Sequence, residues 1–361
     1  MNPKILGWLA LSVLLTFSAC APEKPAAASP SPLGSSTNQP ATPLSGTSVS
    51  LPAPVAVHVC YSGTSGAHVA TWYALEKGLF QKYGLTVDLT SIDSGTKAMT
   101  ALLAGDVQIC QIGASSVVNA AVAGQDAVLI AGFFDTYPAF LMVKTQIKSM
   151  QDLKGKALAI SSPGSATDAG TRLLLKAYGL VPDRDVALVA IGDEGARIAA
   201  MDAGQVSGSL LVAPFDQIAR QRGYTELVDM AKLGIPYEYI GIATSRKYIQ
   251  ANRTVVIDFM KAILESIATA KKDPDGAKAV LAKYLLLDPV KDAAELDDTY
   301  QSMVVSNLKS IPDPSMPAIQ TLLVNLQDTN PSAAQFKPEQ IVDLTILNDL
   351  EASGFITNLE K

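Results

Sequence analysis

The chain has 361 residues, of which 48% are hydrophobic and 17% are charged, and its formal net charge is −6. This apolar content suffices for a large core, and the length predicts more than one lobe. The acidic balance and the lack of a basic stripe argue against nucleic acid as a partner. After residue 20, no segment is apolar over the roughly twenty residues that a membrane-spanning helix needs.

The first twenty residues have the layout of a secretory signal peptide. Lys4 supplies a positive start, residues 5–17 are mostly apolar, and the small residues Ser18 and Ala19 precede Cys20. A cysteine in this position resembles the lipobox of bacterial lipoproteins. That resemblance implies that Cys20 is lipidated and becomes the mature N-terminus, anchored to the outer side of the cell membrane. The alternative is a plain secretory signal with a chance cysteine.

Residues 21–54 differ in composition from the rest of the chain. They are mostly Pro, Ala, Ser, Thr and Gly, and only Glu23 and Lys24 are charged. Such a segment buries too little apolar surface to offset the entropy lost on ordering. It is therefore expected to be a disordered tether between the anchor and a globular part.

From residue 55 onward, short apolar stretches alternate with helical patterns. This alternation predicts a parallel sheet with helices on both faces, and short apolar strands suit a sheet that is buried on both sides. The expected strands are residues 55–61, 85–92, 107–112 and 127–134, and the expected helices are residues 67–80, a segment opened by residues 93–96 and closed by Gly105, and residues 117–123.

The pattern then starts again. Ser149 and Asp152 form a capping-box signature before the next strand. Residues 246–361 are expected to be nearly all helical. The other expected strands are residues 139–144, 156–160, 185–191, 208–212 and 239–244, and the other expected helices in this part are residues 168–178 and 194–203.

These two successive groups of strands and helices predict an α/β fold of two lobes, each a mostly parallel sheet flanked by helices. The chain would cross between the lobes near residues 143–146 and 239–242. Ligands commonly bind between lobes and at the carboxyl ends of parallel strands. The expected division is residues 55–142 for the first part of lobe 1, 143–238 for lobe 2, and 239–361 for the second part of lobe 1 with the C-terminal helices.

The loops after the strands share one chemistry, because each combines Gly with Ser or Thr at the start of a helix. Glycine lets a backbone approach a ligand, hydroxyls donate hydrogen bonds, and free N–H groups at a helix start attract anions. Plain N-capping is the alternative for any one loop. The candidate ligand-binding residues in these loops are Ser62, Gly63, Thr64, Ser65, Ser94, Gly95, Thr96, Ser115, Ser116, Gly164, Ser165, Ala166 and Thr167.

Aromatic and acidic residues supply further candidates. Tyr137 and Tyr239 lie at strand ends and are expected to line the cleft, as is Tyr61. Asp193 is a candidate for a ligand's hydrogen-bonding group, although acids at such positions are commonly solvated or capping residues. The other acids considered in the same way are Asp93, Asp135, Glu194 and Glu238.

No binding-loop arginine stands out as an anion clamp, because Arg172 falls inside a helix and Arg197 is expected at the surface. Cys60 and Cys110 are expected to be buried free thiols, although export permits a disulfide.

The search for catalytic, metal and cofactor sites gives no candidate. His58 and His68 are the two histidines and have no clear third metal ligand. Phosphate-binding, dinucleotide-binding and nucleophile-elbow motifs are absent. Residues 94–97 match the S-x-x-K pattern of penicillin-binding enzymes without its companion motifs. The sequence therefore predicts a binding protein and no enzyme, with no cofactor and no metal.

Several motifs resemble the ABC-transporter substrate-binding proteins for sulfonates, nitrate and taurine, which share a domain with thiamine-pyrimidine precursor proteins. The resemblance covers about residues 55–310. It is carried by residues 73–80 (YALEKGLF), 83–85 (YGL), 94–102, 105–107 (GDV), 152–156 (DLKGK), 162–164, 178–180 (YGL) and 201–204.

This resemblance implies a type II periplasmic-binding fold that closes on a small ligand by hinge motion. It implies a monomer that delivers a sulfonate-, nitrate- or taurine-like anion to an ABC permease and its ATPase. A pyrimidine, a flavin or another heteroaromatic ligand is the alternative. The alternative classes are a ligand sensor and an enzyme like the thiamine-pyrimidine synthases.

Overall fold

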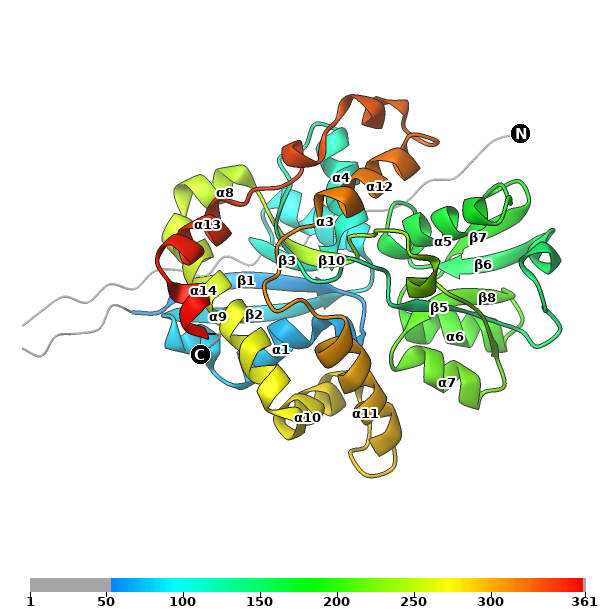
Figure 1. Ribbon diagram of the computed structural model, residues 1–361, viewed down its shortest axis with the longest axis horizontal. Helices are drawn as coiled ribbons and strands as arrows, with labels where there is room; N and C mark the ends of the chain where they lie inside the picture. Colours follow the sequence, from blue (N-terminus) through cyan, green and yellow to red (C-terminus); the bar gives the residue numbers. More distant parts are fainter. Residues whose placement is uncertain (1–52, 360–361) are drawn as a thin grey trace, which may run out of the picture. The chain divides into compact units, whose positions relative to one another are not determined.

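The computed structural model describes residues 53–359, which contain two five-stranded sheets (Figure 1). We call each sheet with its covering helices a lobe. The predicted signal peptide, the lipidation at Cys20 and almost all of the predicted tether lie outside the described residues. Within the described range, no helix combines the length and the apolar character needed to cross a membrane.

Lobe 1 is built on a sheet with the strand order β2-β1-β3-β10-β4. Strand β1 pairs in parallel with β2 and β3, whereas β10 runs antiparallel between β3 and β4. All residues of the three strands β3, β10 and β4 are buried, as expected for a sheet covered on both faces. The strands are β1 (Val55–Ser62), β2 (Leu85–Ile92), β3 (Ile109–Gly113), β4 (Val128–Gly132) and β10 (Ile240–Thr244).

The helices of lobe 1 come from both ends of the chain. The single helix predicted over residues 67–80 is divided, because Gly78 adopts a left-handed φ of 67° between α1 and α2. Helix α9 packs on both of these helices. The helices are α1 (Val69–Glu76), α2 (Leu79–Lys82), α3 (Gly95–Ala104), α4 (Ala114–Val122), α8 (Arg246–Ala251), α9 (Arg253–Lys272), α10 (Pro274–Leu285), α11 (Ala293–Tyr300), α12 (Met316–Leu326), α13 (Thr345–Ala352) and α14 (Phe355–Leu359).

Lobe 2 repeats this plan with the strand order β7-β6-β8-β5-β9. Its antiparallel strand is β5, the fourth in the order, as β10 is in lobe 1. Strand β9 is absent from the sequence-based prediction. The elements are β5 (Ala139–Val143), β6 (Lys156–Ile160), β7 (Val186–Ala190), β8 (Gly208–Val212), β9 (Thr225–Asp229), α5 (Ala166–Ala177), α6 (Glu194–Asp202) and α7 (Phe215–Gln221).

Side chains on the two faces of the lobe 2 sheet enter two hydrophobic cores. Leu210 belongs to the large core shared with α5, and Leu211 belongs to a smaller core with Ile198 and Met201 of α6. Neighbouring strand residues alternate in this way because successive side chains point to opposite faces. Figure 1 accordingly shows α5 on one side of the sheet and α6 and α7 on the other. The predicted α/β fold with two mostly parallel sheets is confirmed.

The chain crosses between the sheets twice, and both crossings lie ahead of the predicted positions. The first falls between β4 and β5, in residues 133–138, because β5 already pairs within lobe 2. The second falls between β9 and β10, in residues 230–239. The residues of a strand next to a crossing do not show which of the two sheets the strand joins. The apolar pattern of residues 139–144 therefore predicts a strand but not the lobe to which that strand belongs.

The expectation of free thiols at Cys60 and Cys110 is wrong. Strands β1 and β3 are neighbours, and their register places these two residues directly opposite each other. The sulfur atoms form a disulfide, with Cα atoms 4.5 Å apart. Both residues are fully buried. The bond therefore closes a loop of 50 residues inside the core of lobe 1.

This disulfide is expected to stabilise the protein. Closing a loop of this size lowers the entropy of the unfolded chain by an amount worth about 4 kcal/mol. Reduction, or the double substitution Cys60→Ala with Cys110→Ala, should lower the midpoint of guanidinium unfolding. The double variant is the matched control, since reductant should not move its midpoint further. An unchanged midpoint of the wild-type chain under reductant would contradict the bond.

Candidate functional site

Four helices of the two lobes begin at one cavity, which we call the interlobe cavity. Its lining contains the N-cap residues of α3, α4, α5 and α6, namely Ser94, Gly113, Ser165 and Asp193. This convergence arises because each helix follows a strand whose carboxyl end lies at the same edge of its sheet. The cavity is lined by Ser62, Gly63, Asp93, Ser94, Gly95, Gly113, Tyr137, Ser161, Ser165, Ala166, Thr167, Asp193, Glu194, Tyr239 and Ile240.

The helix starts give the interlobe cavity a positive electrostatic character. The first N–H groups of a helix have no partner within the helix and carry the positive end of its dipole. The side chains of Ser94, Ser165 and Asp193 each accept one of these N–H groups. Within residues 53–359, none of the residues lining this cavity is a lysine or an arginine. Backbone dipoles and hydroxyls are therefore what it offers to an anion.

The two lobes touch each other beside this cavity. The hydroxyl oxygens of Thr96 in lobe 1 and Ser162 in lobe 2 lie 2.5 Å apart. A Cβ atom on Gly113 would lie 2.7 Å from the Cβ of Ala166, so only glycine permits this approach of α4 to α5. The cavity has a volume of about 30 Å³, enough for one or two waters. The lobes are therefore in a closed arrangement.

Three tyrosines stack at the chain crossings, and two of them, Tyr137 and Tyr239, line the interlobe cavity. In the sequence, Tyr137 precedes β5, and Tyr237 and Tyr239 precede β10. The ring of Tyr137 stacks on Tyr239 at 4.3 Å and on Tyr237 at 5.1 Å between centroids. The Tyr237 hydroxyl donates to the carbonyl oxygen of Ala166 at 2.8 Å. Burial raises the pKa of all three phenols, so they stay neutral donors.

Arg197 is not at the surface as predicted, because its side chain is 1% exposed behind the interlobe cavity. Its Nη2 lies 2.7 Å from Oε1 of Glu194, one turn earlier on α6. Its other donors reach Ser209 Oγ at 3.3 Å and the carbonyl oxygen of Leu210 at 3.0 Å. Glu194 is likewise buried and lines the cavity, rather than being solvated. An acid and an arginine three positions apart, next to the apolar residues of α6, are the signal that could have found this pair.

The structure brings together ten of the sixteen residues predicted to bind ligand. Gly63 and Tyr239, for example, reach the cavity from different lobe 1 segments. Tyr61 does not line it but packs against His68 and Trp72 in the core. The ten are Ser62, Gly63, Ser94, Gly95, Tyr137, Ser165, Ala166, Thr167, Asp193 and Tyr239, and the remaining six, outside this lining, are Thr64, Ser65, Thr96, Ser115, Ser116 and Gly164.

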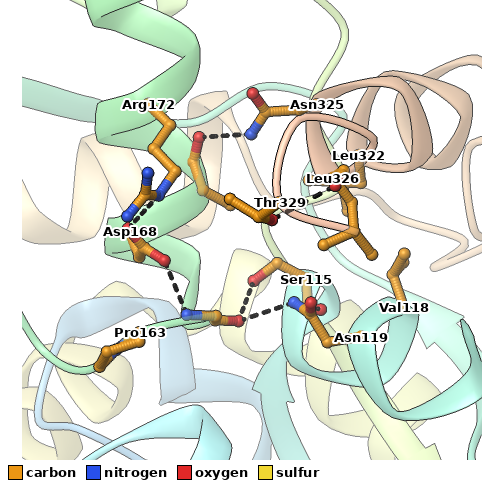
Figure 2. Close-up of a pocket in the computed structure, with 12 residues that line it drawn as sticks. Ser115, Val118, Asn119, Pro163, Asp168, Arg172, Leu322, Asn325, Leu326 and Thr329 are labelled. Carbon is orange, nitrogen blue, oxygen red and sulfur yellow. Dashed lines mark hydrogen bonds and ion pairs between the residues drawn. The ribbon is translucent and has the colours of Figure 1, made fainter. Parts of the chain in front are cut away.

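Two of these six line a second cavity, of about 170 Å³, beside the interlobe cavity (Figure 2). Its polar groups bond to one another. The carbonyl oxygen of Gly164 accepts from Ser115 Oγ at 3.3 Å and from Asn119 Nδ2 at 3.1 Å. Asp168 accepts from Arg172 Nε and from the Gly164 N–H, both at 2.7 Å. The bonds to Gly164 connect α4 of lobe 1 to the loop before α5 of lobe 2 and are part of the closed arrangement, whereas the Asp168 bonds lie within lobe 2.

Glu238 lies in the second crossing and is fully buried, contrary to its expected role as a solvated or capping acid. Its Oε2 accepts the backbone N–H of Ser315 at 2.7 Å. Burial raises the pKa of this carboxyl to about 8, although the Ser315 bond and Lys309 act in the other direction; Asp135 and Asp313 raise it further. Glu238 is therefore largely protonated at neutral pH.

The raised pKa makes stability depend on pH. In the folded protein Glu238 keeps its proton up to about pH 8, whereas in the unfolded chain it loses the proton near 4.5. The unfolding free energy should therefore fall as pH rises from about 4.5 to about 8. Glu238→Gln should remove this part of the slope in urea unfolding, while Glu351→Gln, at an exposed position, should leave it in place. Equal slopes in both variants would contradict the assignment.

Within residues 53–359, no group of three histidines, cysteines or acids is placed to hold a metal ion. His58 pairs with Asp88, with 3.1 Å between Nδ1 and Oδ2. His68 is buried, and its Nε2 lies 2.8 Å from the carbonyl oxygen of Ser62. Burial lowers the pKa of His68 to about 4, so this ring is neutral.

Comparison with known proteins places this site in context. The family model described as "NMT1/THI5 like" matches residues 65–277, more than half of the chain. The taurine-binding periplasmic protein of Escherichia coli K12 is 27% identical over 224 residues, which are 61% of this chain and 68% of that protein.

Solved structures show the same fold. The alkanesulfonate-binding protein SsuA of Xanthomonas axonopodis pv. citri, bound to MOPS, superimposes with a TM-score of 0.66 at 20% identity, over 79% of this chain and 96% of that one. The periplasmic nitrate-binding protein NrtA of Synechocystis PCC 6803 gives a TM-score of 0.66 at 10% identity, over 85% and 91%. The two-lobe periplasmic-binding fold expected from the sequence is confirmed.

Proposed function

Since the chain belongs to the NMT1/THI5-like family, we propose that it is the solute-binding protein of an ABC importer. It captures a small anion in the interlobe cavity and delivers it to the permease. The observation that carries this proposal is the convergence of four helix N-termini on one cavity between two lobes. The similar proteins described above are binding proteins for taurine, alkanesulfonate and nitrate, and they support capture rather than catalysis.

Helix starts suit a sulfonate, carboxylate or nitrate group. Several N–H groups of fixed direction converge on the ligand, and the dipoles favour negative charge without a mobile side chain. The hydroxyls of Ser62, Ser161 and Thr167 add donors around the same cavity. Ordering costs on binding are small because these donors are already held by the fold.

The closed lobes favour a small ligand. A cavity of about 30 Å³ admits few atoms unless the lobes move apart. Opening would separate Thr96 from Ser162 and α4 from α5, and the two chain crossings are where the backbone would bend. A heteroaromatic ligand has less support, because the ring of Tyr137 already stacks on two other tyrosines.

Removal of one cavity hydroxyl should weaken binding. A hydrogen bond to a charged group contributes about 1.5 kcal/mol or more, so Ser62→Ala should raise the dissociation constant of the bound anion by about tenfold. The measurement is isothermal titration calorimetry with taurine, ethanesulfonate, nitrate and acetate. Ser91→Ala, on the exposed part of the adjacent strand β2, is the matched control. Failure of all four anions to bind the wild-type chain would refute the ligand class.

We also propose that the chain is exported and held at the membrane by a lipid on Cys20, with residues 21–54 as the tether. Cys20→Ser should move the protein from the membrane fraction to the released fraction and abolish labelling by radioactive palmitate. Cys60→Ala with Cys110→Ala serves as the control, because those cysteines lie in the fold and should leave labelling intact. Membrane retention of the Cys20→Ser protein would contradict lipid anchoring.

A further inference from the structure

The interlobe cavity carries negative side chains as well as positive helix starts. Its lining includes the carboxylates of Asp93, Asp193 and Glu194. Carboxylates in the lining raise the cost of binding a bare anion, because like charges repel and burial strengthens the repulsion. The distribution of charge therefore contains information about the ligand beyond its anionic group.

The three carboxylates differ in their partners. Asp93 pairs with Lys97 at 2.7 Å, and both side chains are substantially exposed to solvent. Asp193 accepts the N–H of Ala196 through Oδ1 at 2.9 Å, as the cap of α6. Glu194 is more than nine-tenths buried and lies against Arg197 through Oε1.

Arg197 fixes the position of the Glu194 carboxylate. The guanidinium also bonds to the carbonyl oxygens of Asp193 and Leu210 and to Ser209, all in lobe 2. Arg197 does not line the cavity, whereas Glu194 does. Glu194 therefore stands between Arg197 and the cavity, with one oxygen on the guanidinium.

The second oxygen of Glu194 faces lobe 1. A Cβ atom on Gly63 would lie 3.3 Å from Oε2, so this oxygen meets the loop after β1. Tyr137 and Tyr239 line the same cavity, and besides burial, which raises the pKa of both phenols, the Arg197 charge lowers it and the Glu194 charge raises it. A carboxylate oxygen at the cavity wall is a favourable partner for a cationic group.

We propose that the ligand is a small zwitterion, whose anionic group lies at the N-termini of α3, α4 and α5 and whose ammonium group is bound by Glu194 with Asp193. Glu194 is the residue that determines this specificity, and Arg197 is a positioning residue. The inference rests on the proposed function, since it concerns the same cavity. It excludes nitrate and simple sulfonates as the preferred ligands.

Matched ligands test the proposal directly. Taurine and isethionate differ only in an ammonium against a hydroxyl group, as do β-alanine and 3-hydroxypropionate, and ethanolamine has the ammonium group without the acid. Calorimetry of the full chain should show at least about tenfold tighter binding of one zwitterion than of its hydroxyl partner. Glu194→Gln should reduce that ratio to about one, and so should Arg197→Lys, which displaces the carboxylate. Glu351→Gln should keep the ratio.

Each outcome bears on one of the two proposals. Equal binding of a zwitterion and its hydroxyl partner by the wild-type chain overturns the zwitterion inference and leaves anion capture standing. A Glu194→Gln protein that keeps the full ratio overturns the role of Glu194. Binding of ethanolamine as tight as that of the zwitterions overturns anion capture itself. Binding of none of these ligands overturns the zwitterion inference, and the anion titrations then decide the proposed function separately.

Discussion

Parallel strands impose the arrangement on which the rest of this structure depends. Because β2 and β3 run in the same direction in lobe 1, and β6 and β7 do so in lobe 2, the helices that follow these strands begin at one edge of each lobe. The two crossings then bring these edges face to face. Four N-cap residues from α3 to α6 consequently line one cavity, and backbone dipoles concentrate there. The Ser, Thr and Gly composition of the loops follows from that position, since such residues cap helices and allow close approach.

The chain crossings are packed with aromatic side chains. The rings of Tyr137, Tyr237 and Tyr239 stack on one another there. Glu238, which lies between Tyr237 and Tyr239 in the sequence, is buried. Apart from the crossings, the lobes are joined by hydrogen bonds from α4 to the loop before α5, between α12 and α5, and between α7 and α11. Opening of the lobes would break these side-chain bonds, whereas the two covalent crossings would remain and bend.

Local patterns of apolar and capping residues predict much of the fold. The parts that they do not predict depend on which strands and side chains pair with each other. Apolar strands of five residues between capped helices predict the α/β class and most elements. The residues of a strand do not show which strands pair with it. The sequence therefore could not predict the disulfide between Cys60 and Cys110 or the lobe to which β5 belongs. The cavity loops were predictable from their Gly and Ser content. Arg197 was misplaced because a charge is ordinarily solvated, and its buried pairing with Glu194 depends on the packing of α6.

We propose that an anionic group binds at the helix starts between the lobes. A crystal structure of the chain grown with taurine tests this proposal most directly. We expect a sulfonate within hydrogen-bonding distance of first-turn N–H groups of α3, α4 or α5, in the cavity lined by Ser94 and Ser165. A sulfonate found elsewhere on the protein, or an empty cleft at saturating taurine, would contradict it.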